Sequence, residues 1–75
     1  MKFKVRHYST DRLRSEMELA KSRLRGYLAA RAEMPMTSIL GTLAIAAGIK
    51  HEESFIAALK EEYDKRIEAD SSAAE

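Results

Sequence analysis

Two histidines, His7 and His51, are the side chains of this 75-residue chain best suited to acid–base or metal chemistry. His51 is followed directly by Glu52 and Glu53, which gives the group a superficial likeness to a metal-ligand cluster. Neighbouring residues on a helix point about 100° apart, and no second histidine stands four residues from His51. We interpret the cluster as a solvated helix start, with acids at the positive end of the helix dipole.

Other catalytic arrangements are not encoded in any spacing of this chain. Serine, histidine and aspartate residues are present, but no nucleophile elbow links them. The three glycines are isolated and form no phosphate-binding loop, and there is no cysteine for thiol chemistry, disulfides or a thiolate metal site. We therefore predict a protein that is not an enzyme and that uses no cofactor and no metal.

The charged residues are divided between the two halves of the chain. Residues 1–31 carry nine Lys or Arg against three acids, a net of +6, whereas residues 32–75 carry four basic residues against nine acids, a net of −5. Such a division indicates either a basic surface for a polyanion or two halves that attract each other. In the second case, basic residues of the first helix would face acids near the C-terminus across a helix–helix seam. The basic set is Arg14, Lys21 and Arg25, and the acidic set is Glu61, Glu62 and Glu68.

The length of the chain favours association. Seventy-five residues make at most one domain, and a domain of this size buries only about 60% of the surface its unfolded chain exposes. Without a disulfide or metal, a second copy is the expected source of further stability, so we predict a homodimer. The first residues are too polar for a signal peptide, and the apolar residues 39–49 are far fewer than the roughly 20 that span a bilayer. We expect a cytoplasmic protein with no membrane association.

The N-terminus alternates basic and apolar residues, which is typical of a strand. Lys2, Lys4 and Arg6 fall on one side of an extended segment, with Phe3 and Val5 on the other. No second strand is predicted, so the segment would pair with the same segment of another copy or form a frayed arm. We predict one domain over residues 1–70, with a strand or arm at 2–8, followed by a disordered tail at 71–75.

Three helices are predicted after this strand. The first begins at the capping residues Ser9 to Asp11 and ends before Pro35. Its apolar stripe comprises Leu13, Met17, Ala20, Leu24, Tyr27 and Leu28. The second helix, residues 39–47, is apolar on almost every side and ends at Gly48, so we expect it at the buried centre of the assembly. The third, residues 51–69, is surrounded by acids and carries an apolar stripe of Phe55, Ile56, Leu59, Tyr63 and Ile67. The fold class is mainly α and dimeric, and the alternative is an all-α helical hairpin or bundle without a strand.

These patterns resemble two families of DNA-binding protein. The stretch 43–49 resembles the first helix and turn of a helix-turn-helix, but Glu52 and Glu53 would then face phosphates. Taken together, the basic strand, the amphipathic helix and the run Thr37-Ser38-Ile39 resemble the ribbon-helix-helix family over residues 2–50. That resemblance implies paired strands in the major groove, with backbone amides near Thr37 and Ser38 receiving a phosphate. The candidate nucleic-acid-binding residues are Lys2, Lys4, Arg6, Arg12, Thr37 and Ser38.

Two functions follow from the charge and the helices. The first is a small DNA-binding regulatory protein, active in transcription regulation as a homodimer through its basic N-terminal half. The alternative is a helical protein–protein interaction module, an adaptor or inhibitor of a larger protein, that binds no nucleic acid. The partners are therefore a second copy together with DNA, or a larger protein.

Overall fold

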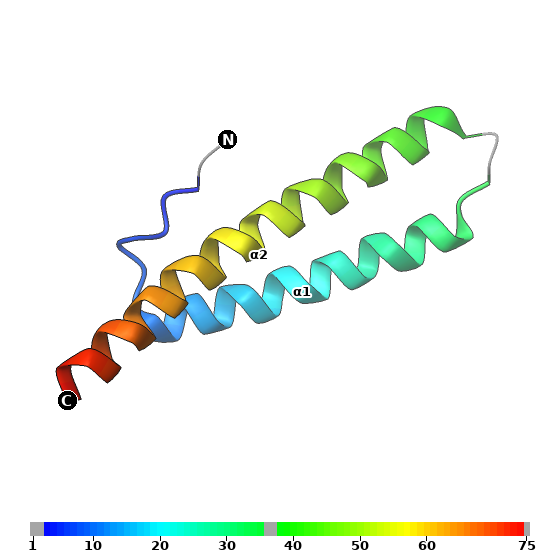
Figure 1. The fold of residues 1–75 in the computed structure, drawn as a ribbon. Helices are drawn as coiled ribbons and strands as arrows, with labels where there is room; N and C mark the ends of the chain where they lie inside the picture. The colour runs from blue at the N-terminus through cyan, green and yellow to red at the C-terminus, as the bar shows by residue number, and fades with distance from the viewer. Residues whose placement is uncertain (1–2, 36–37, 75) are drawn as a thin grey trace.

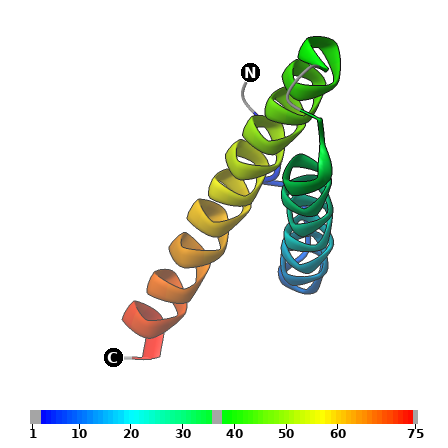
Figure 2. The ribbon, with the colours of Figure 1, turned by 90° about the vertical axis from the view of Figure 1, so that its right-hand side faces the viewer.

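Two long helices account for most of this chain. The computed structural model describes residues 3–35 and 38–74, and its helices are α1 (Thr10–Glu33) and α2 (Ile39–Ala74). The helices lie side by side and antiparallel as a hairpin, with residues 3–9 alongside α2 (Figures 1 and 2). The molecule is elongated, with extents of 57 × 21 × 16 Å. The alternative of a helical hairpin without a strand matches this architecture, whereas the strand followed by three helices is wrong.

The limits of α1 follow from local chemistry, as the sequence predicted. Ser9 caps the helix, and its hydroxyl oxygen accepts a hydrogen bond from the Arg12 amide at 3.1 Å. At the other end, Met34 has an extended backbone with φ −70° and ψ 129°. Proline disfavours a helical conformation in the residue before it, so Pro35 ends α1.

The predicted break at Gly48 is wrong, because α2 continues through it to Ala74. Glycine lowers helix propensity by about 1 kcal/mol relative to alanine, but it does not stop a helix as proline does. Gly48 is also a packing position, since a Cβ built there would stand 2.6 Å from the Tyr27 ring. The predicted second and third helices are therefore one. This helix also enters the segment 71–75, for which the composition predicted a disordered tail.

The strand predicted over residues 2–8 is also wrong in the described part of the chain, because residues 3–9 form an irregular segment, here called the arm. The Tyr8 amide donates to the Val5 carbonyl at 3.1 Å in a turn. Phe3 packs its ring against those of His51 and Phe55, at centroid distances of 5.3 and 5.0 Å. Alternating apolar residues need one apolar surface, which a helix supplies as well as a second strand does. The arm therefore lies on α2 of its own chain.

The core lies where the arm, the start of α1 and the C-terminal half of α2 meet, here called the open end. Leu13 and Leu59 are fully buried there, and Val5 of the arm is 6% exposed. The partly buried side chains around them are Phe3, Tyr8, Met17, Phe55 and Tyr63. Leu13 and Leu59 lie on the apolar stripes predicted for the first and third helices, and these stripes do pack against each other.

Candidate functional site

The described members of the predicted DNA-binding set do not form one cluster. Lys2 and Thr37 lie outside the described residues. Lys4 and Arg6 are exposed on the arm, while Ser38 directly precedes α2, in the connection between the helices. This connection lies at the end of the hairpin opposite to the arm (Figure 1). The Ser38 amide donates to the Pro35 carbonyl at 3.0 Å, so it is already occupied and does not point freely toward a phosphate.

Arg12, another predicted DNA-binding residue, helps to hold the arm. Its guanidinium lies over the Tyr8 ring, 3.7 Å from the centroid, in a cation–π contact. Tyr8 is itself partly buried against the core cluster that contains Val5 and Leu13. One face of the Arg12 guanidinium is thus covered by an aromatic ring.

A second arginine, Arg66 of α2, ties the arm to both helices. Its Nη2 donates to the Arg6 carbonyl at 2.9 Å and its Nη1 to the Thr10 hydroxyl at 3.3 Å. Its Nε donates to Glu62 at 3.2 Å within α2. Arg66 is only 25% exposed, so these hydrogen bonds are partly shielded from water. A basic residue in the acidic half is therefore used for structure.

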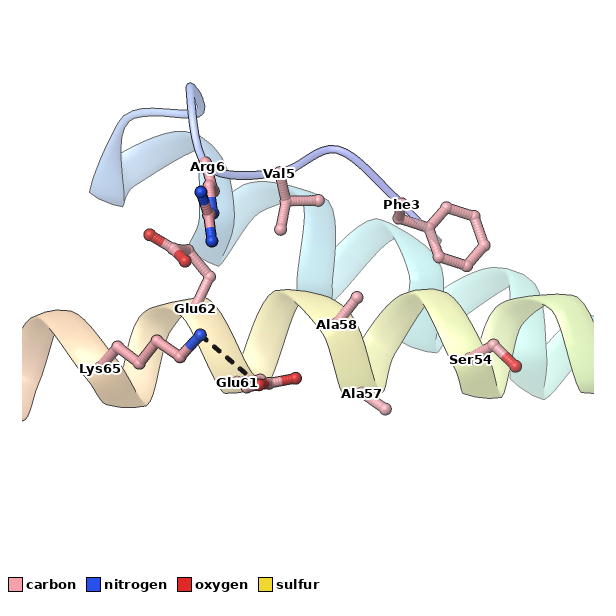
Figure 3. Close-up of a pocket in the computed structure, with 9 residues that line it drawn as sticks. All are labelled: Phe3, Val5, Arg6, Ser54, Ala57, Ala58, Glu61, Glu62 and Lys65. Atoms are coloured by element: carbon pink, nitrogen blue, oxygen red, sulfur yellow. Dashed lines mark ion pairs between the residues drawn. The ribbon is translucent and has the colours of Figure 1, made fainter. Parts of the chain in front are cut away.

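A surface cavity of about 480 Å³ lies between the arm and α2, below Phe3, Val5 and Arg6 (Figure 3). The remaining lining residues are Ser54, Ala57, Ala58, Glu61, Glu62 and Lys65. Arg6 and Glu62 point toward each other in Figure 3, and Lys65 pairs with Glu61 at 3.5 Å. Two basic and two acidic side chains share this lining, so the cavity offers no excess of positive charge to a polyanion.

The predicted ion pairs across the seam are not those that form. Among the residues described, Arg14 pairs with Asp11, and Lys21 with Glu18, within α1. Arg14 reaches α2 through a hydrogen bond from its Nε to the Tyr63 hydroxyl at 3.2 Å, which raises the pKa of Arg14 above its ordinary value. The flank that carries Arg14, Lys21 and Arg25 stays exposed.

One ion pair joins the helices in the described part of the chain, and it is buried on one side. Arg23 Nε donates to Glu52 Oε1 at 3.0 Å, and the Glu52 side chain is 6% exposed against 45% for Arg23. The hydrogen bond to Glu52 raises the pKa of Arg23, and burial opposes the rise. Glu52 Oε2 is buried with no hydrogen-bond partner among the described atoms. This contact joins α1 to α2, and the second carboxylate oxygen stays unsatisfied.

Glu52 was predicted to be a solvated residue at a helix start, and that interpretation is wrong because no helix begins there. The spacing of Glu52 from apolar residues of the same helix could have indicated that it is buried. Ile45, Glu52 and Leu59 are seven residues apart along one helix and therefore share a face. All three are buried.

Three exposed large apolar side chains of the described residues lie together at the loop end, on the first turns of α2. Ile39, Leu40 and Leu43 are 71%, 84% and 61% exposed, and Ala46 and Ala47 beside them are also exposed. We call these five residues the loop-end face. The segment 39–47 was predicted to lie at the buried centre of the assembly; within one chain, this side of it is uncovered.

The loop-end face is directed away from α1. Ile45 and Glu52 are buried on the inner side of α2, and Gly48 contacts Tyr27 of α1. Helical spacing then places Leu43 on the outer side. Full burial of each large aliphatic side chain is worth roughly 1.5–3 kcal/mol, and residues 34–49 carry no charge. The face is chemically suited to contact with another apolar surface.

The described residues offer neither a metal site nor a membrane-spanning helix. Within residues 3–35 and 38–74, no group of three or more His, Asp or Glu side chains is placed to hold a metal ion. No helix in the described ranges has both the length and the apolarity needed to cross a membrane. A comparison with protein-family models, curated proteins and solved structures found no match for this chain. The ribbon-helix-helix arrangement needs an N-terminal strand, which the described arm lacks, so groove binding by paired strands has no support.

Proposed function

We propose that this chain is a non-catalytic helical interaction module that works by burying its loop-end face against an apolar face of a protein partner. The observation that carries the proposal is the exposure of Ile39, Leu40 and Leu43 at 61–84% on one side of a well-formed helix. Large aliphatic side chains gathered on one face mark interaction sites far more often than isolated ones do.

The charge pattern supports a protein partner for this face. The sequence has no charged residue between Glu33 and Lys50. A polyanion would gain no ionic contact there, whereas an uncharged apolar helix face would exclude water from both surfaces. The hairpin supplies a rigid support, because Tyr27 of α1 packs directly on Gly48, behind the face.

A polarity-sensitive fluorophore tests this proposal. The chain has no cysteine, so Leu40→Cys provides a single attachment point on the loop-end face. Leu19→Cys is the matched control, because Leu19 is also exposed, at 54%, but lies on α1. We expect the emission at position 40 to shift to the blue when unlabelled chain or an extract of the host cell is added, with little change at position 19. The proposal fails if neither addition shifts position 40, or if both positions shift equally.

Binding to duplex DNA is a second candidate, supported by the exposed basic flank of α1. Arg14, Lys21 and Arg25 lie on this flank, and Arg25 forms no ion pair with any described residue. Phosphate contacts would make the affinity fall steeply with salt. We expect such binding to be lost when these three residues are changed together to Ala and kept when Lys50 and Lys60 are changed. Absence of binding to mixed duplex DNA at low salt would exclude this candidate.

A further inference from the structure

We infer that the occupant of the loop-end face is a second copy of this chain, with the two α2 helices packed antiparallel about a two-fold axis near Leu43. This inference rests on the proposed function and names its partner. It comes from the surface area, from the order of large and small residues, and from the position of the nearest charges.

The surface area shows that a single chain leaves much of itself uncovered. Its accessible surface is 5845 Å², whereas a compact monomer of this mass exposes roughly 4,650 Å². The excess of roughly 1,200 Å² exceeds the roughly 800 Å² that each partner buries in a standard protein interface. Pairing of two hairpins is therefore compatible with the area that a stable dimer buries.

The order of residues on the face favours self-pairing in one direction. Ile39 and Ala46 lie seven residues apart on one flank, Leu40 and Ala47 lie seven apart on the other, and Leu43 lies between the flanks. An antiparallel copy places Ile39 over Ala46 of the partner subunit, and Leu40 over Ala47 of the partner subunit. Each large side chain then meets a small one, which is the arrangement that fills an interface without voids.

A parallel copy gives the opposite result. Residues at the same level of the two helices would then meet, so Ile39 would meet Leu40 of the partner subunit and Ala46 would meet Ala47 of the partner subunit. Large residues would crowd at one level and small residues would leave a gap at the next. The antiparallel direction is therefore the one that the face encodes.

Charge sets the register. The apolar stretch ends at Lys50, and an antiparallel pairing centred on Lys50 would bring this residue against its own copy. The same shift would place Ile39 opposite Glu61 of the partner subunit. Like charges in contact and a carboxylate on an apolar side chain both oppose that register. Centring near Leu43 keeps Lys50 at the edge of the contact, where it reaches water.

Sedimentation analysis of three forms tests whether the dimer exists and where it joins. The forms are the unmodified chain, Leu43→Glu and the control Leu19→Glu, each checked for helix content. We expect a dimer whose Kd rises roughly a hundredfold in Leu43→Glu, where two carboxylates would meet at the axis, and little in Leu19→Glu. A monomer at every concentration at which the chain stays dissolved overturns the inference, and so does a dimer that is insensitive to Leu43→Glu.

Cross-linking tests the direction of pairing. A mixture of Leu40→Cys and Ala47→Cys chains, treated with a short thiol-reactive linker, should give mainly mixed dimers in the antiparallel register. In a parallel pair these two positions are about 10 Å apart along the axis, and Leu40→Cys would instead link to itself. Preferential self-linking of Leu40→Cys overturns the antiparallel pairing. If the chain is monomeric but host extract still shifts the fluorophore at position 40, the second copy is excluded and the proposed function stands.

Discussion

The two ends of the hairpin differ in how their apolar residues are covered. At the open end, α1, α2 and the arm enclose Leu13 and Leu59 completely. At the loop end the described residues form two helices, and two helices can cover each other on one side alone. The outer side of α2, with Leu40 84% exposed, is left without a third element. The arm thus covers apolar residues at the open end, and a partner would cover those at the loop end.

Truncating one leucine to alanine at each end gives the strongest test of this difference in packing. Leu59→Ala should lower the free energy of unfolding by about 2–5 kcal/mol, because it removes a fully buried side chain and leaves a cavity. Leu40→Ala should change it by less than about 0.5 kcal/mol at protein concentrations low enough to keep the chain monomeric. Urea denaturation followed by helical circular dichroism measures both. Equal losses would mean that the ends are equally packed.

The ion pair between the two ends gives the next largest effect. Arg23→Met should destabilise the fold by about 1–3 kcal/mol, because it leaves the buried Glu52 carboxylate without its hydrogen-bond donor. Since Arg23 is 45% exposed, water screens part of the interaction, and we expect the lower end of that range.

The partner substitution Glu52→Met should behave differently from Arg23→Met. It removes a carboxylate with one unsatisfied buried oxygen, so its effect on stability should be neutral or favourable. Chemical denaturation of both single variants and the double variant measures the coupling. A loss of stability in Glu52→Met as large as that in Arg23→Met would show that the pair itself stabilises the hairpin.

The sequence was informative wherever local chemistry decides the structure. The cap at Ser9, the stop before Pro35 and the stripe through Leu13 depend on neighbouring residues, and the structure confirms them. The alternation of residue types also predicted that Phe3 and Val5 share one side of the arm. It did not predict which element that side packs against, because a second strand and a helix can both supply an apolar surface.

The rest depended on contacts between distant residues. Gly48 continues the helix with the Tyr27 ring packed on it, 21 positions away in the sequence. Continuing α2 through Gly48 sets the helical phase, which turns Glu52 inward and Leu43 outward. The sequence shows that the candidate site lies in an uncharged segment. Which side of that segment is exposed could be deduced only once α2 was known to be continuous through Gly48.

The arm is tested by trimming its buried residue. Val5→Ala should cost about 1.5 kcal/mol, because two methyl groups of a side chain that is 6% exposed are removed. Lys4→Ala is the control, since Lys4 is exposed on the same segment and should change stability little. Thermal unfolding of the two variants at equal concentration measures the difference. A null effect of Val5→Ala would mean that the arm does not cover the core in solution.

Gly26 in α1 and Gly48 in α2 give the smallest and most discriminating test. A Cβ added at Gly26 meets nothing within 4 Å, so Gly26→Ala should stabilise the chain by about 1 kcal/mol through helix propensity alone. Gly48→Ala gains the same propensity, but its Cβ would stand 2.6 Å from the Tyr27 ring and force the ring to move. We therefore expect a net loss at Gly48, measured by the same thermal unfolding. If Gly48→Ala stabilises as much as Gly26→Ala, Tyr27 does not pack on α2 behind the loop-end face, and the rigid support assigned to that face is absent.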